Sequence, residues 1–145
     1  MMRATGACLL LTLALLPSQG LAQGKRWQRQ VRAQLERTLS ALEGSHGQSR
    51  VLRMGPLNTE ESESLTVEMK AGTAYDIVGA CDEDCSSLHL LLSTATGSDV
   101  AVDRSSENLP VLQFTPAQSG SYRIKVTLAA CRVNPCWYGV ALKGS

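Results

Sequence analysis

The chain of 145 residues is long enough for one domain with its own core and too short for two. Its formal net charge of +1 combines 14 Lys and Arg residues with 13 Asp and Glu residues, so it lacks the strongly basic balance of a nucleic-acid-binding protein. Seven of the basic residues but only two of the acidic ones lie between Gly24 and Arg53, so a basic N-terminal segment precedes an acidic remainder.

Residues 1–22 have the pattern of a secretory signal peptide. Arg3 supplies the positive charge, an apolar run extends from Leu9 to Leu16, and Gly20-Leu21-Ala22 is a small-x-small cleavage site. The apolar run is about half of the roughly 20 residues that span a bilayer, so cleavage is a better interpretation than a transmembrane anchor. We therefore expect a chain that begins near Gln23 and is exported to a periplasm or to the cell exterior.

Residues 23–49 are predicted to form a basic amphipathic helix and a flexible link. Apolar side chains recur at helical spacing and share one stripe: Trp27, Val31, Leu35, Leu39 and Leu42. The stripe either packs on the following domain, with a solvated back, or the helix docks on an anionic membrane surface or an acidic partner. Docking would use Arg26, Arg29 and Arg32. Gly44 ends the predicted helix, and the polar residues 45–49 around Gly47 form the flexible link.

From residue 50 the periodicity changes to the alternation of strands. Leu65, Val67 and Met69 alternate with polar residues. Further strand-like runs occupy residues 75–80, 88–93, 100–103, 111–115, 121–128 and 137–142. Turn residues join the runs, and the connections are too short for the crossover helices of a parallel sheet. Residues 50–145 are therefore predicted to form an all-β domain, an antiparallel β-sandwich or jelly roll of about seven to eight strands.

Without the signal peptide, four cysteines remain in two close pairs, Cys81 with Cys85 and Cys131 with Cys136. In an oxidising compartment this pattern indicates two disulfide bonds, and its spacings are not those of a zinc site. Local pairing would close short loops worth about 2 kcal/mol each, whereas pairing Cys81 with Cys136 would close a longer loop worth about 4 kcal/mol. Because each pair brackets a turn between consecutive strands, we favour local pairing, and the cross pairing stays open.

The first cysteine pair encloses the acidic residues Asp82, Glu83 and Asp84. Carboxylates in a tight loop are suitable ligands for calcium, with Asp103 or Glu107 from a neighbouring loop as a further ligand. The alternative is a solvated acidic loop that needs no ion. A calcium site at Asp82, Asp84 and Asp103 is therefore one hypothesis, and no other motif requires a cofactor.

Trp137 and Tyr138 directly follow the second cysteine pair. Adjacent residues of a strand face opposite sides, so one side chain is expected in the core and the other outside it. The pair is either a stacking platform for a carbohydrate or peptide, or a packing element in which Trp137 covers the disulfide and Tyr138 fills the core.

A catalytic constellation is not found in the sequence. His46 and His89 are isolated, and no Gly-x-Ser-x-Gly, His-Glu-x-x-His or phosphate-binding glycine loop occurs. We therefore predict that the protein is not an enzyme. A hydrolase that uses loop carboxylates remains an alternative, because the sequence does not give their distances in space.

Several segments resemble, in their order, the bacterial pre-peptidase C-terminal domain. They are Leu57-Asn58, Ser64 to Met69, Ala71 to Tyr75, Leu88-His89-Leu90, Pro110 to Pro116 and Ser119 to Ile124. The resemblance covers residues 50–145. It implies a small jelly-roll-like β-sandwich that is usually appended to exported enzymes, is non-catalytic, and in some members binds matrix polymers or calcium. Family members often have alternating acidic residues where this chain has Ser87 to Leu90, and here the domain stands alone.

These patterns predict a non-catalytic exported module that binds or stabilises an unidentified protein or extracellular polymer, with calcium as an optional aid. The alternative is a regulatory or inhibitory partner of an exported enzyme that it contacts through the N-terminal helix. A pull-down with and without residues 23–49 would separate the two functions. We do not expect nucleic acid as a ligand, because the basic residues lie on one short helix.

Overall fold

The computed structural model describes residues 19–43 and 45–144. Most of the predicted signal peptide lies outside the described residues. One helix precedes the strands: α1 (Gln19–Ala41), β1 (Ser49–Leu57), β2 (Ser62–Met69), β3 (Tyr75–Cys81), β4 (Cys85–Thr94), β5 (Asp99–Asp103), β6 (Val111–Phe114), β7 (Gly120–Cys131) and β8 (Cys136–Lys143).

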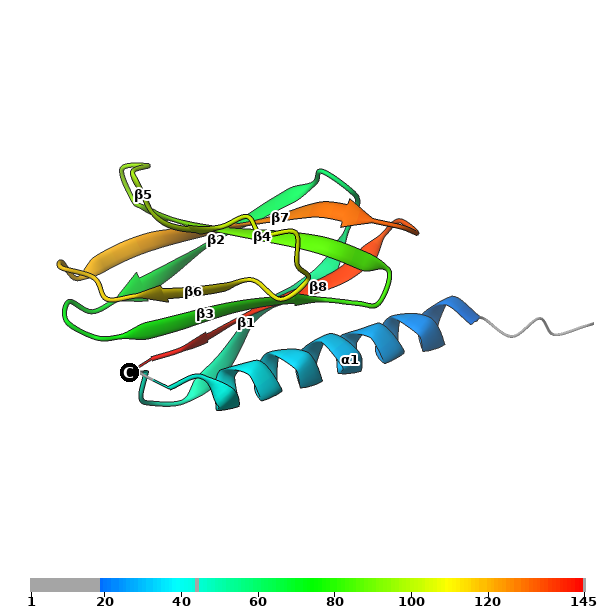
Figure 1. Cartoon of the computed structure of the whole chain (residues 1–145), viewed down its shortest axis with the longest axis horizontal. Helices are drawn as coiled ribbons and strands as arrows, with labels where there is room; N and C mark the ends of the chain where they lie inside the picture. The colour runs from blue at the N-terminus through cyan, green and yellow to red at the C-terminus, as the bar shows by residue number, and fades with distance from the viewer. Residues whose placement is uncertain (1–18, 44, 145) are drawn as a thin grey trace, which may run out of the picture.

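The strands form two four-stranded sheets that pack face to face (Figure 1). Sheet A has the order β1-β8-β3-β6 and sheet B the order β2-β7-β4-β5, and all paired strands are antiparallel. Side chains from both inner faces, such as Ile77 of sheet A and Leu90 and Ile124 of sheet B, are fully buried between the sheets. The predicted antiparallel β-sandwich is confirmed.

Strand β1 has no counterpart among the predicted strand-like runs. Its apolar residues face both ways, because Leu52 and Leu57 contact the core between the sheets while Val51 and Met54 contact α1. A bulge between Val51 and Arg53 also interrupts the alternation. β1 lies at the edge of sheet A, where a proline such as Pro56 is tolerated.

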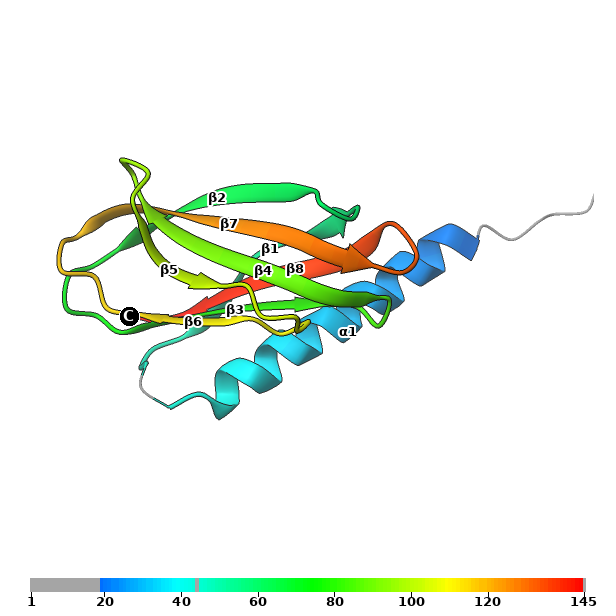
Figure 2. The ribbon, with the colours of Figure 1, turned by 45° about the horizontal axis from the view of Figure 1, so that its top comes forward.

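Helix α1 packs on the outer face of sheet A, away from sheet B (Figure 2). Val31, Leu35 and Leu39 of its apolar stripe are buried. A side chain at Gly139 of β8 would begin only 2.8 Å from Val31 Cγ1 and 2.9 Å from Leu35 Cδ1, so glycine allows the close approach of helix and sheet. The stripe packs on its own domain and is not free to enter a membrane. Among the described residues, no helix combines the length and apolarity needed to cross a bilayer.

The segment after α1 is fixed to sheet A. Ser45 is buried, and its hydroxyl donates a hydrogen bond to the buried carboxylate of Asp76 in β3. Lys143 Nζ of β8 donates to the carbonyl oxygens of Leu39 and Leu42 at 3.3 and 3.1 Å. The end of the helix and the start of the sandwich therefore share polar contacts, and the flexibility of the link at residues 45–49 stays a prediction.

Candidate functional site

The two cysteine turns meet at one end of the sandwich. Residues 82–84 cross from β3 in sheet A to β4 in sheet B, and residues 132–135 return from β7 in sheet B to β8 in sheet A. Because β3 pairs with β8 and β4 with β7, the two turns lie side by side. With residues 58–61, the turn between β1 and β2, they form what we name the disulfide end.

The disulfide bonds close each turn on itself. Cys81 bonds to Cys85 and Cys131 to Cys136, with S–S distances of 1.98 and 2.06 Å. This is the local pairing rather than the cross pairing. Cys85 and Cys131 are also register partners in sheet B, so the two bonds are neighbours in space.

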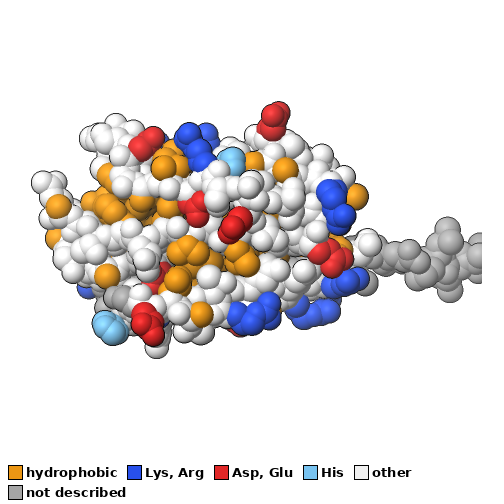
Figure 3. Space-filling model, viewed as in Figure 1, with side chains coloured by type: hydrophobic (Ala, Val, Ile, Leu, Met, Phe, Trp, Pro, Cys, Tyr) orange, Lys and Arg blue, Asp and Glu red, His pale blue; other side chains and the backbone are white. Residues whose placement is uncertain are grey.

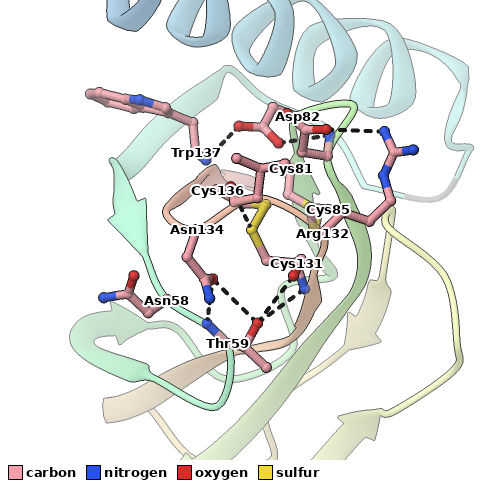
Figure 4. The surroundings of a disulfide bond; sticks show 12 residues. Asn58, Thr59, Cys81, Asp82, Cys85, Cys131, Arg132, Asn134, Cys136 and Trp137 are labelled. Atoms are coloured by element: carbon pink, nitrogen blue, oxygen red, sulfur yellow. Dashed lines mark hydrogen bonds and ion pairs between the residues drawn. A yellow bond between two sulfur atoms is a disulfide. The ribbon is translucent and has the colours of Figure 1, made fainter. Parts of the chain in front are cut away.

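The carboxylate of Asp82 joins the two cysteine turns. It is 2% exposed, accepts hydrogen bonds from the backbone N–H of Trp137 at 2.7 Å and of Asp84 at 3.1 Å, and lies in the upper part of Figure 4. The backbone N–H of Asp82 donates in turn to the carbonyl of Trp137 at 2.9 Å. Burial raises the pKa of Asp82 above its ordinary value, more than these donors lower it. Asp82 thus links the two cysteine turns.

Further side chains from the three turns extend the network. Arg132 Nη2 lies 3.0 Å from Asp84 Oδ1, and the backbone N–H of Arg132 donates to the carbonyl of Asp84 at 2.8 Å. Asn134 Oδ1 accepts from the backbone N–H of Thr59 at 2.9 Å, and Thr59 Oγ1 accepts from the N–H of Cys131 at 3.2 Å (Figure 4). All three turns are therefore held to each other through defined polar contacts.

A groove of about 430 Å³ lies between these turns and the N-terminal half of α1. Its walls include Trp27 of the helix, Trp137 of β8, and Val133 and Asn134 of the second cysteine turn. Val133 is 64% exposed, so its apolar side chain is available for contact with a partner. The groove combines aromatic walls, an exposed aliphatic side chain and amide groups, the residue types that contact polypeptides and sugars.

Trp137 and Tyr138 face opposite sides, as predicted for neighbours in a strand. Trp137 is half-buried in the cluster between α1 and sheet A, and Figure 4 shows its ring turned away from the disulfides. Tyr138 is fully buried between the sheets, and its hydroxyl donates to Glu63. Burial raises the pKa of Tyr138, and the contact with Glu63 raises it further. The ring of Tyr138 fills the core, as in the packing alternative, whereas Trp137 does not cover the disulfide. Ligand stacking on Trp137 stays a prediction.

The residues predicted to bind calcium have protein partners. Asp103 Oδ1 accepts from the N–H and hydroxyl of Ser105 at 2.9 and 2.8 Å, and Oδ2 accepts from the N–H of Val111 at 3.0 Å. Burial alone would raise the pKa of Asp103, but these hydrogen bonds outweigh it and lower the pKa. Within residues 19–43 and 45–144, no three His, Cys, Asp or Glu side chains are arranged for a metal ion. Calcium binding at Asp82, Asp84 and Asp103 stays a prediction.

The side chains that a hydrolase could use for acid–base chemistry do not lie in one site. Asp82 and Asp84 line the groove, whereas His89 lines a different hollow on sheet B. The absence of enzymatic activity remains a prediction from the sequence.

The three arginines proposed for docking do not form one surface patch. Arg26 lies 3.6 Å from Glu83 and over the ring of Trp27, at the disulfide end. Arg29 and Arg32 line a shallow hollow farther along α1. Figure 3 shows Lys and Arg side chains gathered along the N-terminal half of the helix. Docking through these arginines stays a prediction.

No family model matches this sequence, and no curated protein sequence matches it. The structure is similar to the crystal structure of PliG from Aeromonas hydrophila, a periplasmic lysozyme inhibitor of g-type lysozyme. The TM-score is 0.50 at 15% sequence identity, and the match covers 72% of this chain and 90% of PliG. At this identity the likeness shows a shared β-sandwich fold. The resemblance to the pre-peptidase C-terminal domain stays a prediction.

Proposed function

We propose that the protein is an exported, non-catalytic inhibitor that binds an exported enzyme through its disulfide end. The observation that carries this proposal is the shared sandwich fold with PliG, a periplasmic inhibitor of g-type lysozyme. A g-type lysozyme is therefore the first enzyme to test. This function is the alternative predicted from the sequence, but the contact surface changes from the helix to the turns beside its N-terminal half.

The compartment supports the proposal. Two disulfide bonds persist in an oxidising environment, outside the cytoplasm, which is also where exported hydrolases act. An inhibitor that must remain folded beside a hydrolase benefits from covalent closure of its binding turns.

The disulfide end has the physical properties of a preformed binding surface. Its three turns are fixed by two disulfides and by the side chains of Asp82, Thr59 and Asn134. Binding through ordered turns costs less conformational entropy than binding through loops that must first become ordered. Val133 projects from this surface beside two tryptophans, and aromatic residues are enriched where protein interfaces are most tightly packed.

Deletion of the helix is unsuitable as a test of the contact surface. Val31, Leu35 and Leu39 are buried on Val78, Ala80 and Ala141 of sheet A, so a chain without residues 23–49 would expose this cluster. Loss of a partner would then report misfolding. Point substitutions at exposed positions avoid this ambiguity.

The experiment measures hydrolysis of peptidoglycan by a g-type lysozyme at increasing concentrations of the protein without residues 1–22. We expect saturable inhibition. Val133→Asp should weaken binding about tenfold or more, because a charge replaces an apolar contact. Val102→Asp, the same change at a 53% exposed position on β5, is the matched control and should inhibit like the unaltered protein.

The outcomes separate the two parts of the proposal. If the unaltered protein neither inhibits nor binds the lysozyme, this enzyme class is wrong. Should both valine variants inhibit equally well, the disulfide end is not the contact surface.

A further inference from the structure

The outer face of sheet B has no covering layer among the described elements. Helix α1 lies on sheet A, on the opposite side of the molecule, and the two views of the ribbon show β4 and β7 open to solvent on their outer side (Figures 1 and 2). Strand alternation places leucines 88, 90 and 92 of β4 toward the core, so His89 and Leu91 face outward.

A small hollow of about 50 Å³ is formed on this face. Its lining comes from three segments: His89, Leu90 and Leu91 of β4, Lys125 and Thr127 of β7, and Arg104 after β5. The strand register explains this convergence. His89 is opposite Thr127 and Leu91 is opposite Lys125, while the pairing of Leu90 with Asp103 brings the next residue, Arg104, beside β4.

The hollow holds two cations without a carboxylate partner. The ion pairs among the described residues involve Arg26, Arg53 and Arg132, and none involves Arg104 or Lys125. Asp103, the nearest acidic residue along the chain to Arg104, uses both oxygens to accept hydrogen bonds from Ser105 and Val111. Two like charges that line one small hollow repel each other, and an anion between them would remove that repulsion.

We propose that this hollow binds a phosphate group. Arginine and lysine are the residues that most often bind phosphate, and donors that converge from three directions suit a tetrahedral oxyanion. The hydroxyl of Thr127 and the ring of His89 add polar groups, and each is positioned by a serine: Ser62 Oγ lies 2.8 Å from Thr127 Oγ1, and Ser87 Oγ lies 3.3 Å from His89 Nε2. A cavity measured in this way needs roughly 10–15 Å³ to hold one water, so the hollow has room for one small group.

Two kinds of ligand could supply the phosphate group. It is either free in solution or part of a phospholipid headgroup. Val102 is the register partner of Leu91 and is 53% exposed, and Val100 on the same strand is 38% exposed. Val102 is thus beside a residue that lines the hollow, as expected for a surface that touches the lipid interface. The hollow shares no lining residue with the groove at the disulfide end, so a test of phosphate binding does not depend on the proposed inhibitory function.

The first experiment is a titration of the isotope-labelled protein with inorganic phosphate, followed by ¹H–¹⁵N NMR at constant ionic strength. We expect saturable shifts at His89, Arg104, Lys125 and Thr127. The double variant Arg104→Gln/Lys125→Gln should bind at least about tenfold more weakly, because two charge-assisted contacts are lost. Arg123→Gln is the matched control, since Arg123 lies two residues from Lys125 on β7 but does not line the hollow. Equal weakening by Arg123→Gln, or equal shifts with chloride, would overturn the proposal.

The second experiment identifies the source. Sedimentation with vesicles of phosphatidylglycerol, compared with phosphatidylcholine, measures lipid binding. Binding to phosphatidylglycerol that is lost in the double variant and weakened by Val102→Asp assigns the site to a headgroup. Binding of inorganic phosphate without sedimentation assigns it to soluble phosphate. If neither probe binds, the hollow is not a phosphate site.

Discussion

The two ends of the sandwich reverse the chain by different means. At the disulfide end, covalent bonds and the buried carboxylate of Asp82 hold the turns together. At the opposite end, the chain turns through residues 70–74, 95–98 and 115–119, and no disulfide is found in these described turns. There Gly72 and Gly97 adopt positive φ angles of 75° and 91°, which glycine adopts without steric cost.

This difference indicates which end of the sandwich contributes more to stability. The opposite end relies on glycine conformation and on exposed hydrogen bonds, such as that from the N–H of Ala71 to Ser119 Oγ at 2.8 Å. At the disulfide end the carboxylate of Asp82 is buried, so water cannot readily replace the hydrogen bonds that it accepts. We therefore expect the same kind of substitution to cost more stability at the disulfide end than at the opposite end.

Removal of the disulfides should have the largest effect. Replacement of Cys81 and Cys85, or of Cys131 and Cys136, by alanine should lower the free energy of unfolding by about 2 kcal/mol per pair, because the unfolded chain gains loop entropy. Urea denaturation followed by tryptophan fluorescence measures this. Gly72→Ala, at the opposite end, should cost only about 1 kcal/mol. A larger loss from Gly72→Ala would contradict the comparison.

Substitution of Asp82 should have the next largest effect. Asp82→Ala leaves the N–H groups of Trp137 and Asp84 without their acceptor and should cost about 1 to 2 kcal/mol in unfolding free energy. Ser119→Ala removes the acceptor of an exposed N–H that water can replace, so we expect less than about 0.5 kcal/mol. The same denaturation experiment compares them, and equal losses would mean that the two ends are equally fixed.

The pH dependence should distinguish Asp82 from Asp103. The pKa of Asp82 is raised by burial, so its contribution to stability is fully present below the ordinary value of 3.8 and is lost as the pH rises through the folded value. The stability of Asp82→Asn relative to the unaltered protein should therefore be higher near pH 7 than near pH 3.

Asp103 supplies the control of opposite sign. Its pKa is lowered, so its contribution is present above the ordinary value of 3.8 and is lost as the pH falls through the folded value. The stability of Asp103→Asn relative to the unaltered protein should be lower near neutral pH than in acid. Thermal unfolding across this pH range checks both variants, and parallel profiles for the two would refute the assignment.

Calcium should have the smallest effect. If the acidic turn binds calcium, the thermal midpoint in millimolar calcium will exceed that in chelator. We expect a rise smaller than the loss from removal of a disulfide, because Asp82, Asp84 and Asp103 already have protein partners. An unchanged midpoint would end the calcium hypothesis.

The strand alternation in the sequence was sufficient to predict the sandwich, because the inward side chains of β2, β4 and β7 form regular runs. It was not sufficient for β1, where α1 covers one face and the core covers the other. Helical periodicity identified the buried stripe of α1 but not the sheet that buries it.

The candidate site was only partly predictable. The cysteine spacing drew attention to the two turns, and the local turn chemistry favoured the pairing that the structure has. The contact between Asp82 and Trp137 spans 55 residues, and that between Thr59 and Asn134 spans 75. Such contacts depend on the strand order within and between the sheets, which no local pattern contains. Val133 carried no sign of exposure beyond its place in a turn.

The position of β8 has a consequence for the order of folding. β8 is the last strand in the chain, yet it lies between β1 and β3 in sheet A and also contacts α1. β1 is an edge strand that pairs with β8, so it cannot reach its neighbour in sheet A until residues 136–143 are available. Strands β1 and β3, which precede β8 in the chain, therefore become joined in one sheet only after β8 has been inserted between them.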